Sequence, residues 1–218
     1  MKHVIQPQLS FLGAGFTFMK PWYVKIFGAP IHIGKCATLI ASPDNRVRLS
    51  VWSDRVDRGH IRMGDYCMIC PGVRIGSADG ITIGNNCMIA SNVYISDSDW
   101  HDIYNRIALG KTKPVNIADN VWVGDGAIIC KGVSIGKNSI IGAGAVVSKD
   151  IPPDCISAGN PAKIIKQLNP NEKMVTRADF FHNPEKLFRE FDKFDRVILG
   201  KNSLLHWMRH LILPKKND

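Results

Sequence analysis

The stretch VNIADNVWVGDGAIICKGVSIGKNSIIGAGAVVS, residues 115–148, decides the fold of this 218-residue chain. An aliphatic residue recurs at every sixth position, a small residue follows each of them, and a second row keeps the same interval. The first row is Ile117, Val123, Ile129, Ile135, Ile141 and Val147, and the second is Val121, Ala127, Val133, Ser139 and Ala145. A period of six fits neither an α-helix nor a lone amphipathic strand. The pattern therefore predicts a chain that coils round a prism, with three short strands in each coil.

The same interval continues toward the N-terminus in two further blocks, Met63, Ile69, Ile75 and Ile83, Ile89, Ile95. We expect the repeated aliphatic residues to fill the interior and the small residues to let the chain turn tight corners. A slip of two residues separates the two blocks, so residues 77–80 are predicted to bulge from a corner.

Four of the six cysteines fit this repeat as packing residues. Cys67 and Cys87 fall on the second inward row, whereas Cys70 and Cys130 take the small corner position. Cys67 and Cys70 have the spacing of a metal-binding pair, but no second pair or histidine partner completes a zinc site. We therefore expect buried thiols and no metal.

Other segments flank or interrupt the repeat. Residues 1–30 are apolar and irregular, which predicts a cap over one end of the prism, because a stack of coils has an exposed apolar end. Residues 31–165 are expected to form the all-β coil domain, with a strand at 46–52 and a polar interruption at 97–114. Residues 166–218 form a C-terminal extension in which 185–199 has helical spacing.

The end of this extension, residues 204–213, is apolar with basic residues between, and two interpretations stay open. It is either a helix packed on its own assembly or a peripheral membrane anchor, since tryptophan, leucine and basic residues suit a headgroup interface. No apolar run reaches the roughly 20 residues that span a bilayer, and no signal-peptide cleavage pattern follows residues 9–19. The expected location is the cytoplasm, with contact to the inner membrane if the tail anchors.

The net charge of +9 is concentrated in the flanks. Residues 1–60 hold eight basic and three acidic residues, residues 61–162 eight and nine, and residues 163–218 twelve and seven. Nucleic-acid binding is not expected. The sequence shows neither basic residues interleaved with exposed aromatics nor a known nucleic-acid-docking element. The positive flanks suit the phosphates of a nucleotide-like molecule or an anionic membrane surface.

The interruption at 97–114 is the expected place for chemistry, because a long insertion in a minimal coil needs a role. It contains His101, whereas the other six histidines lie in flanks or at corners. An imidazole near neutral pH can take a proton from a hydroxyl as that hydroxyl attacks. An ordinary exposed loop histidine is the alternative at this point.

Several segments together resemble the hexapeptide-repeat acyltransferases. They are Ile83-Gly-Asn-Asn, Asn92-Val-Tyr-Ile-Ser, Trp100-His101, Lys113-Pro-Val, Asp119-Asn-Val-Trp-Val-Gly124, Ile141-Gly-Ala-Gly-Ala-Val-Val-Ser-Lys-Asp150 and Ala158-Gly-Asn-Pro-Ala-Lys163. The subgroup that the chain most resembles is the sugar O-acetyltransferases of the maltose and galactoside type, with their relatives in surface-polysaccharide synthesis. The resemblance implies a left-handed parallel β-helix, a homotrimer, and transfer of an acetyl group from acetyl-CoA to a sugar or glycan hydroxyl without a metal.

The resemblance also implies roles for individual residues. It makes His101 the general base on the acceptor hydroxyl and places Asp79 and Trp100 at the acceptor. The expected contacts to the acetyl-CoA donor are Trp122, Gly124, Asp125, Ala143, Ser148, Lys149 and Lys163, with the last three at the phosphates and a backbone N–H near Gly124 and Asp125 at the oxyanion.

Two departures from the family pattern bear on the acceptor. An acceptor-site asparagine has no counterpart near residues 69–72, and the short N-terminal helical segment of the maltose and galactoside enzymes is absent. Both weaken free maltose or galactoside as the acceptor. The sequence leaves open which hydroxyl or amine is modified and whether the acyl group is longer than acetyl.

Two other functions remain as alternatives. An antibiotic-modifying acetyltransferase would use the same fold and chemistry on a drug hydroxyl, and a non-enzymatic β-helix scaffold would share the fold without the chemistry. The loop histidine and the lysines of the last coils favour an enzyme. Flat prism faces favour side-by-side packing, so we expect active sites between subunits with the 97–114 loop reaching over a neighbour.

Overall fold

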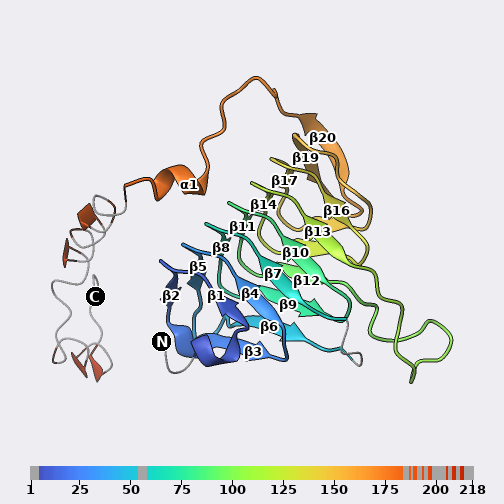
Figure 1. Cartoon of the computed structure of the whole chain (residues 1–218), viewed down its shortest axis with the longest axis horizontal. Helices are drawn as coiled ribbons and strands as arrows, with labels where there is room; N and C mark the ends of the chain where they lie inside the picture. The colour runs from blue at the N-terminus through green and yellow to red at the C-terminus, as the bar shows by residue number, and fades with distance from the viewer. Residues whose placement is uncertain are drawn as a thin grey trace. The chain divides into compact units, whose positions relative to one another are not determined.

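The computed structural model describes residues 5–53 and 58–183, together with scattered positions beyond 183. The chain divides into two compact units, Met1–Ala178 and Asp179–Asp218. The first unit is a parallel β-helix in which the chain visits three sheets in turn, as the colour progression in Figure 1 shows.

The three sheets, called A, B and C here, form the three faces of the prism. Sheet A contains β1 (Phe11–Leu12), β4 (Ile31–Ile33), β7 (Ile61–Met63), β10 (Ile81–Ile83), β13 (Val115–Ile117) and β16 (Ser134–Ile135). Sheet B contains β2 (Thr17–Met19), β5 (Thr38–Ile40), β8 (Met68–Ile69), β11 (Met88–Ile89), β14 (Trp122–Val123), β17 (Ile140–Ile141), β19 (Cys155–Ala158) and β20 (Lys163–Gln167). Sheet C contains β3 (Val24–Phe27), β6 (Val47–Val51), β9 (Arg74–Ser77), β12 (Tyr94–Ser96), β15 (Ile128–Ile129) and β18 (Val146–Val147).

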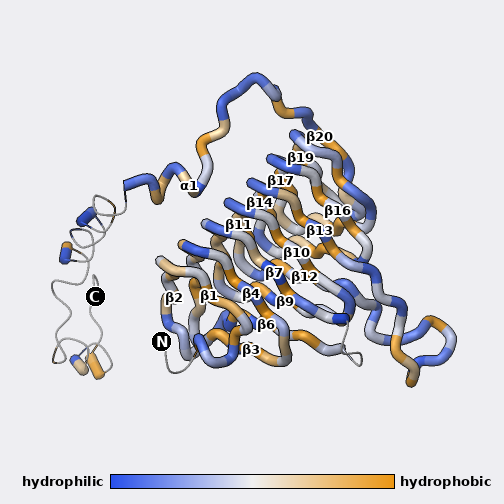
Figure 2. Tube along the Cα trace, in the orientation of Figure 1, coloured by the Kyte–Doolittle hydropathy of each residue, from blue (hydrophilic) through white to orange (hydrophobic). Residues whose placement is uncertain are grey.

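The interior confirms the six-residue repeat. Every residue of the two predicted inward rows in 115–148 is buried, as are the two earlier aliphatic blocks. Cys67 and Cys87 are fully buried on the second row, and all six cysteines are free thiols. The hydropathy alternates along the strands in Figure 2, because one side of each strand faces the core and the other faces outward.

The first coil begins earlier than the sequence predicts. Strands β1, β2 and β3 pair in parallel with β4, β5 and β6, so residues 11–27 form a coil inside the segment expected to be an irregular cap. The repeat is not visible there because the corners are longer and hold the 3₁₀ helix η2 (Pro21–Tyr23). Only the stretch before β1, with η1 (Gln6–Gln8) and the buried Ile5, precedes the coil stack.

The corners form three edges along the prism, which we name by the sheets they join. The A/B edge contains residues 34–36, 64–66, 84–86, 118–120, 136–138 and 152–154. The B/C edge contains 41–46, 70–72, 90–92, 124–126, 142–144 and 159–161. The C/A edge contains 28–30, 52–53 with 58–60, 78–80, 97–114, 130–132 and 148–150.

Polar side chains link successive coils along the A/B edge. The backbone N–H of Lys35 donates to Asp65, that of Asp65 to Asn85, and that of Asn85 to Asp119, at 2.9, 2.8 and 2.6 Å. Side-chain hydrogen bonds continue this ladder from Asn120 through Asn138 to Asp154. The edge residues Tyr66, Asn86, Asn120, Asn138 and Asp154 have positive φ, a conformation in which asparagine and aspartate are enriched.

The C-terminal end of the β-helix closes with β20, which pairs antiparallel with β19. The short helix α1 (Arg177–Phe180) follows at the junction of the two units. In the second unit the described positions among 185–199 and 204–213 are helical, apart from Leu213. The remaining positions of those two predicted segments, Trp207 included, lie outside the described residues. No helix in the described part of the chain is long and apolar enough to cross a membrane.

Candidate functional site

The insertion at 97–114 leaves the C/A edge between β12 and β13 and projects away from the coils, at the lower right of Figures 1 and 2. An antiparallel bridge between Ser98 and Thr112 holds its base. Its outer part carries exposed apolar side chains, with Tyr104 95% and Ile107 96% accessible. Exposed apolar groups on a projecting loop are typical of a segment that contacts another chain.

His101 lies on this loop with one ring nitrogen engaged. Its Nδ1 is 3.0 Å from the carbonyl oxygen of Arg106. A carbonyl can only accept, so the neutral ring carries its proton on Nδ1 and leaves the lone pair of Nε2 available. The side chain is exposed to solvent.

Asp97 is a residue of this region that sequence reasoning missed. Its side chain is fully buried, and its carboxylate accepts from Ser77 Oγ and from the backbone N–H groups of Ala78, Asp79 and Gly80, at 2.6–2.9 Å. These four donors come from residues 77–80, where the sequence predicts a bulge: Ser77 ends β9, and Ala78, Asp79 and Gly80 form the corner before β10. A buried carboxylate with four donors keeps its charge satisfied and fixes the bulge beside the loop base.

A second missed contact joins the loop to the next coil. Lys131 Nζ lies 2.7 Å from both Oδ1 and Oδ2 of Asp99. Lys131 lies in the 130–132 corner, the next corner of the C/A edge after the loop. The ion pair therefore holds the first turn of the loop against the coils. The repeat pattern does not point to this ion pair or to the buried Asp97. The only signal in the sequence is an acid at each end of the first loop turn, Asp97 and Asp99.

The predicted acceptor residues Asp79 and Trp100 both lie on the C/A edge. Asp79 accepts a hydrogen bond from Thr112 Oγ1 at 3.3 Å, at the other end of the loop. Trp100 adopts a positive φ of 62° and donates from Nε1 to Tyr94 Oη at 3.2 Å. A hollow of about 250 Å³ lies beside it, lined by Trp52, Arg58, Ala78, Ser98, Trp100, Leu109, Gly110 and Thr112.

Most of the predicted donor residues lie on a different edge. Gly124, Asp125 and Ala143 occupy successive corners of the B/C edge, and Trp122 precedes them on β14 with its side chain 46% accessible. Gly126 and Gly144, at the same corners, have open space where a Cβ would stand. The backbone is therefore open to its surroundings at these two corners.

The three residues expected at the cofactor phosphates are split between the two edges. Lys163 begins β20 directly after the B/C corner at 159–161, whereas Ser148 and Lys149 lie on the C/A edge at the end of β18. All three side chains are exposed. The structure therefore does not gather them into one cluster within a single chain.

His101 and the B/C edge are thus separated by the width of sheet C. From Asn92 to Asp97 the chain covers five residues, about 16 Å at about 3.3 Å per residue. The acceptor residues and most of the donor residues cannot meet within one prism. They can meet where the C/A edge of one prism lies against the B/C edge of another.

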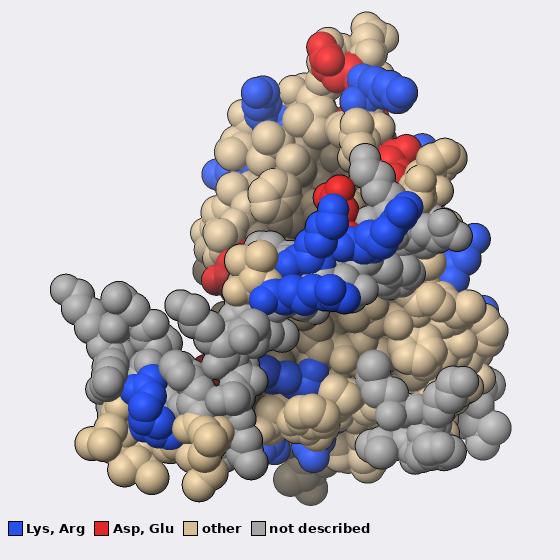
Figure 3. All heavy atoms as spheres, turned by 90° about the vertical axis from the view of Figure 1, so that its left-hand side faces the viewer, with Lys and Arg blue, Asp and Glu red and all other residues tan. Residues whose placement is uncertain are grey.

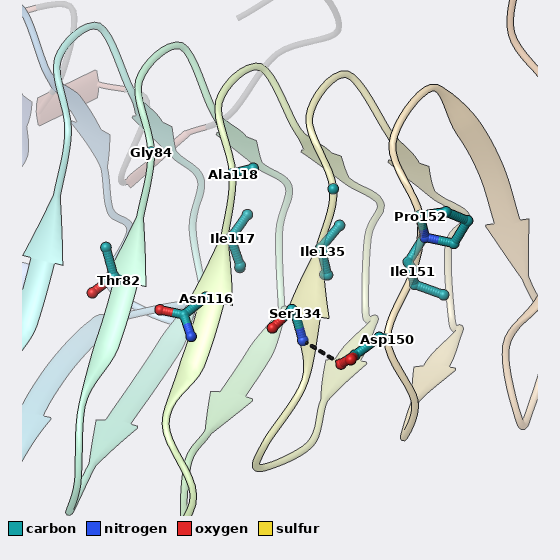
Figure 4. Close-up of a pocket in the computed structure, with 11 residues that line it drawn as sticks. Thr82, Gly84, Asn116, Ile117, Ala118, Ser134, Ile135, Asp150, Ile151 and Pro152 are labelled. Carbon is teal, nitrogen blue, oxygen red and sulfur yellow. Dashed lines mark hydrogen bonds between the residues drawn. The ribbon is translucent and has the colours of Figure 1, made fainter.

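The largest hollow among those described lies on sheet A and does not contain a predicted residue. It has a volume of about 700 Å³, and Figure 4 shows the short side chains of Thr82, Asn116 and Ser134 across its floor. Asp150 closes one side and accepts from the Ser134 N–H at 2.7 Å. On the face drawn in Figure 3, basic side chains are more prominent than acidic ones, in keeping with the net charge.

Known protein families match the same segments of the chain that carry the repeat. The family "Bacterial transferase hexapeptide (six repeats)" matches residues 114–149, and "Hexapeptide repeat of succinyl-transferase" matches 61–97. The galactoside O-acetyltransferase of Escherichia coli K12 is 41% identical over 31% of this chain and 33% of its own length. The polysialic acid O-acetyltransferase of Escherichia coli O1:K1 is 48% identical over 51% of this chain and 31% of its own length. The chain thus spans about a third of the length of these relatives.

Solved structures share the architecture. A maltose O-acetyltransferase from Clostridium difficile 630 is 27% identical, with a TM-score of 0.50 over 77% of this chain and 74% of that one. AntD, an N-acyltransferase from Bacillus cereus solved with dTDP and coenzyme A, is 18% identical with a TM-score of 0.55 over 88% and 96%, and shows the fold alone.

The fold and its repeat define a class, the left-handed parallel β-helix proteins built from hexapeptide repeats. Hexapeptide-repeat family models match both blocks of coils, residues 61–97 and 114–149, as the sequence resemblance predicts.

Proposed function

We propose that this protein is an O-acetyltransferase that moves an acetyl group from acetyl-CoA to a hydroxyl of a sugar, in the synthesis of a surface polysaccharide. The observation that carries the proposal is the arrangement of His101. Its Nδ1 hydrogen-bonds to the Arg106 carbonyl oxygen, which leaves Nε2 free of that bond. The side chain is exposed on the loop that also carries Trp100. The names of the galactoside and polysialic acid relatives support the acetyl group and the sugar.

The chemistry follows from that arrangement. His101 Nε2 accepts the proton of the sugar hydroxyl as its oxygen attacks the thioester carbonyl of the donor. A carbon–oxygen bond forms, the carbon–sulfur bond breaks, and the proton on His101 passes to the departing thiolate. The Arg106 carbonyl stabilises the imidazolium that exists between these steps, because it accepts from Nδ1–H.

The donor would be held by the B/C edge. The open corners at Gly126 and Gly144 suit a pantetheine arm, and Trp122 offers an exposed aromatic face beside them. Lys163 is near the end of this edge and suits a phosphate as a mobile point charge. Acetyl-CoA supplies the activated thioester, and the residues named here only bind and orient it.

The active assembly would be a homotrimer. The C/A edge with His101 and the B/C edge with Trp122 lie on opposite sides of sheet C, so neighbouring prisms must contribute one edge each. The exposed side chains of Tyr104 and Ile107 provide the apolar contact by which the loop would hold its neighbour. Light scattering at micromolar concentration is expected to give three times the chain mass, and a monomer there would contradict this assembly.

The reaction is tested by release of free CoA thiol from acetyl-CoA with a panel of sugars, oligosaccharides and antibiotics as acceptors. The proposal expects release that depends on a sugar acceptor and an O-acetyl product by mass spectrometry. Transfer to a drug hydroxyl alone would assign the protein to antibiotic modification. Binding of acetyl-CoA without transfer to any acceptor would favour a scaffold.

Mixed trimers test the shared site. His101→Ala removes the base at the C/A edge, and Ala143→Trp blocks the exposed B/C corner with a large side chain. Each variant alone is expected to be inactive, whereas trimers reassembled from both contain some sites with one intact edge from each chain and regain activity. If mixing restores nothing while the mixed trimers form, the two edges belong to separate sites.

A further inference from the structure

A row of positive charges runs across the outer face of sheet C. Lys25, Arg48 and Arg74 are exposed and lie in register on the neighbouring strands β3, β6 and β9. Adjacent strands are about 4.8 Å apart, and like charges directly opposite each other destabilise a sheet. None of the three forms an ion pair with a residue that the structure describes. The fold therefore holds a repulsive row that a bound anion would stabilise.

The row leads to the base of the catalytic loop. On the next strand, β12, the partner of Arg74 is Tyr94, and the Arg74 guanidinium lies 4.7 Å from the centre of its ring. The Tyr94 hydroxyl in turn accepts from Trp100, the residue before His101. A chain molecule that follows the cations along sheet C would therefore arrive at the loop that carries the general base.

A second row lies two residues further along each strand, beside the cations, and aromatic rings adjoin it. Ser50, Gly76 and Ser96 are in register there, and a Cβ on Gly76 would stand 3.2 Å from Trp100 Cζ2, so the indole lies close against the sheet. At the start of the row Phe27 stacks on Trp52, with ring centres 4.2 Å apart.

These rings border a hollow of about 570 Å³, lined by Phe27, Val51, Trp52, Ser53, Trp100 and Leu109. Phe27 is 53% and Trp52 56% accessible, so two large aromatic faces are open to solvent beside the charged row. The face thus combines apolar ring surfaces with a row of cations that form no ion pair among the described residues.

We propose that the outer face of sheet C binds an acidic glycan, an extended chain of sugars that carry carboxylates. The carboxylates contact Lys25, Arg48 and Arg74, and the apolar faces of the sugar rings stack on Phe27, Trp52 and Trp100. The inference rests on the proposed function and names its substrate class. Carboxylates fit better than phosphodiester links, because each such link consumes hydroxyls that would otherwise accept the acetyl group.

Calorimetry with the full-length protein tests the surface without acetyl transfer. The probes are hexamers of galacturonate, hexamers of glucose, a thymidylate oligonucleotide of equal charge, and vesicles with anionic lipid. The expected result is binding of hexagalacturonate that weakens with salt, and much weaker binding of the neutral hexamer. Arg48→Gln with Arg74→Gln should weaken hexagalacturonate binding by about tenfold or more, since two charged hydrogen bonds are lost.

Arg62→Gln is the matched control, because Arg62 is exposed in the same coils but on sheet A. It should leave the affinity within about twofold. Equal loss in the control, equal binding of both hexamers, or no loss in the double variant would overturn the inference. Tighter binding of the oligonucleotide or the vesicles, lost in the double variant, would replace the glycan by a nucleic acid or a membrane. Failure of acetyl transfer with intact hexagalacturonate binding would count against the proposed function alone.

Discussion

The A/B and C/A edges of the prism are built from corners of the same coils, but their polar side chains have different partners. At the A/B edge the corners are all short, and carboxylates and amides accept or donate hydrogen bonds to a neighbouring coil. At the C/A edge the corners range from the short 130–132 to the long 97–114. In the regular corners the polar groups bond to the next coil, whereas at the long corner they bond within the insertion, to the corner at 78–80 and to Lys131.

The contrast is sharpest for two aspartates. Asp119 on the A/B edge is partly exposed and accepts a single backbone N–H from Asn85. Asp97 on the C/A edge is fully buried and accepts four donors from one bulge. Hydrogen bonds to a charged group are strongest away from water. The buried carboxylate of Asp97 therefore holds the interrupted corner more strongly than Asp119 holds a regular one.

The largest expected effect is at the loop histidine. His101→Ala should lower acetyl transfer on the order of a hundredfold or more, as expected for loss of a general base. His101→Asn is the matched variant, because its amide can still donate to the Arg106 carbonyl and keep the loop conformation. Both should retain the unfolding temperature of the parent. Near-full activity of either variant with its acceptor would remove His101 from the reaction.

The two aspartates give the next effect. Asp97→Asn replaces an acceptor of four bonds by a group that must turn an NH₂ toward donors, so we expect a loss of about 2–4 kcal/mol in unfolding free energy. Asp119→Asn keeps a carbonyl for its single N–H and should cost less than about 1 kcal/mol. Urea unfolding of both variants measures the difference. Equal losses would mean that the bulge at 77–80 does not depend on the buried carboxylate.

The regular part of this comparison could be predicted from the sequence. The period of six predicts which side chains are buried, because each coil repeats the same interior position, and the inward rows from Met63 to Val147 are confirmed. The slip between Ile75 and Ile83 predicts the bulge. The first coil could not be predicted, since residues 11–27 have longer corners and lack the interval.

The site was only partly visible in the sequence. His101 stands out because it lies in the one long interruption of the repeat. The buried Asp97 and the Lys131–Asp99 pair depend on which coils the loop touches, and a linear pattern does not contain that information. The same holds for the row of Lys25, Arg48 and Arg74, whose spacing in the sequence is irregular although the strands bring them into register.

The lysines of the last coils test the donor end. Lys149→Ala and Lys163→Ala should weaken acetyl-CoA binding by about three- to tenfold, with little change for acetyl-pantetheine, which lacks the nucleotide phosphates. High salt should reduce the effect, because exposed charges are screened within about 8–10 Å. Lys137→Ala, an exposed lysine of the A/B edge, is the control and should change neither donor. Equal weakening of both donors would show that the lysines act on structure or at the acetyl end.

The smallest effect distinguishes two ion pairs, one on each edge. Lys131 contacts both oxygens of Asp99 at 2.7 Å with the lysine side chain only 27% accessible, whereas Lys35 lies 3.7 Å from Asp65 with 53%. Exposed pairs contribute little to stability, so Lys35→Met should leave the unfolding free energy unchanged, and Lys131→Met should change it by no more than about 1 kcal/mol. Activity should separate them, because Asp99 belongs to the turn that positions His101. Lys131→Met is expected to lower kcat by about two- to fivefold through looser placement of the loop, and Lys35→Met to leave it unchanged. Steady-state kinetics on both variants decides the matter: if kcat is the same in the two, the ion pair on the C/A edge is as incidental to the reaction as the one on the A/B edge.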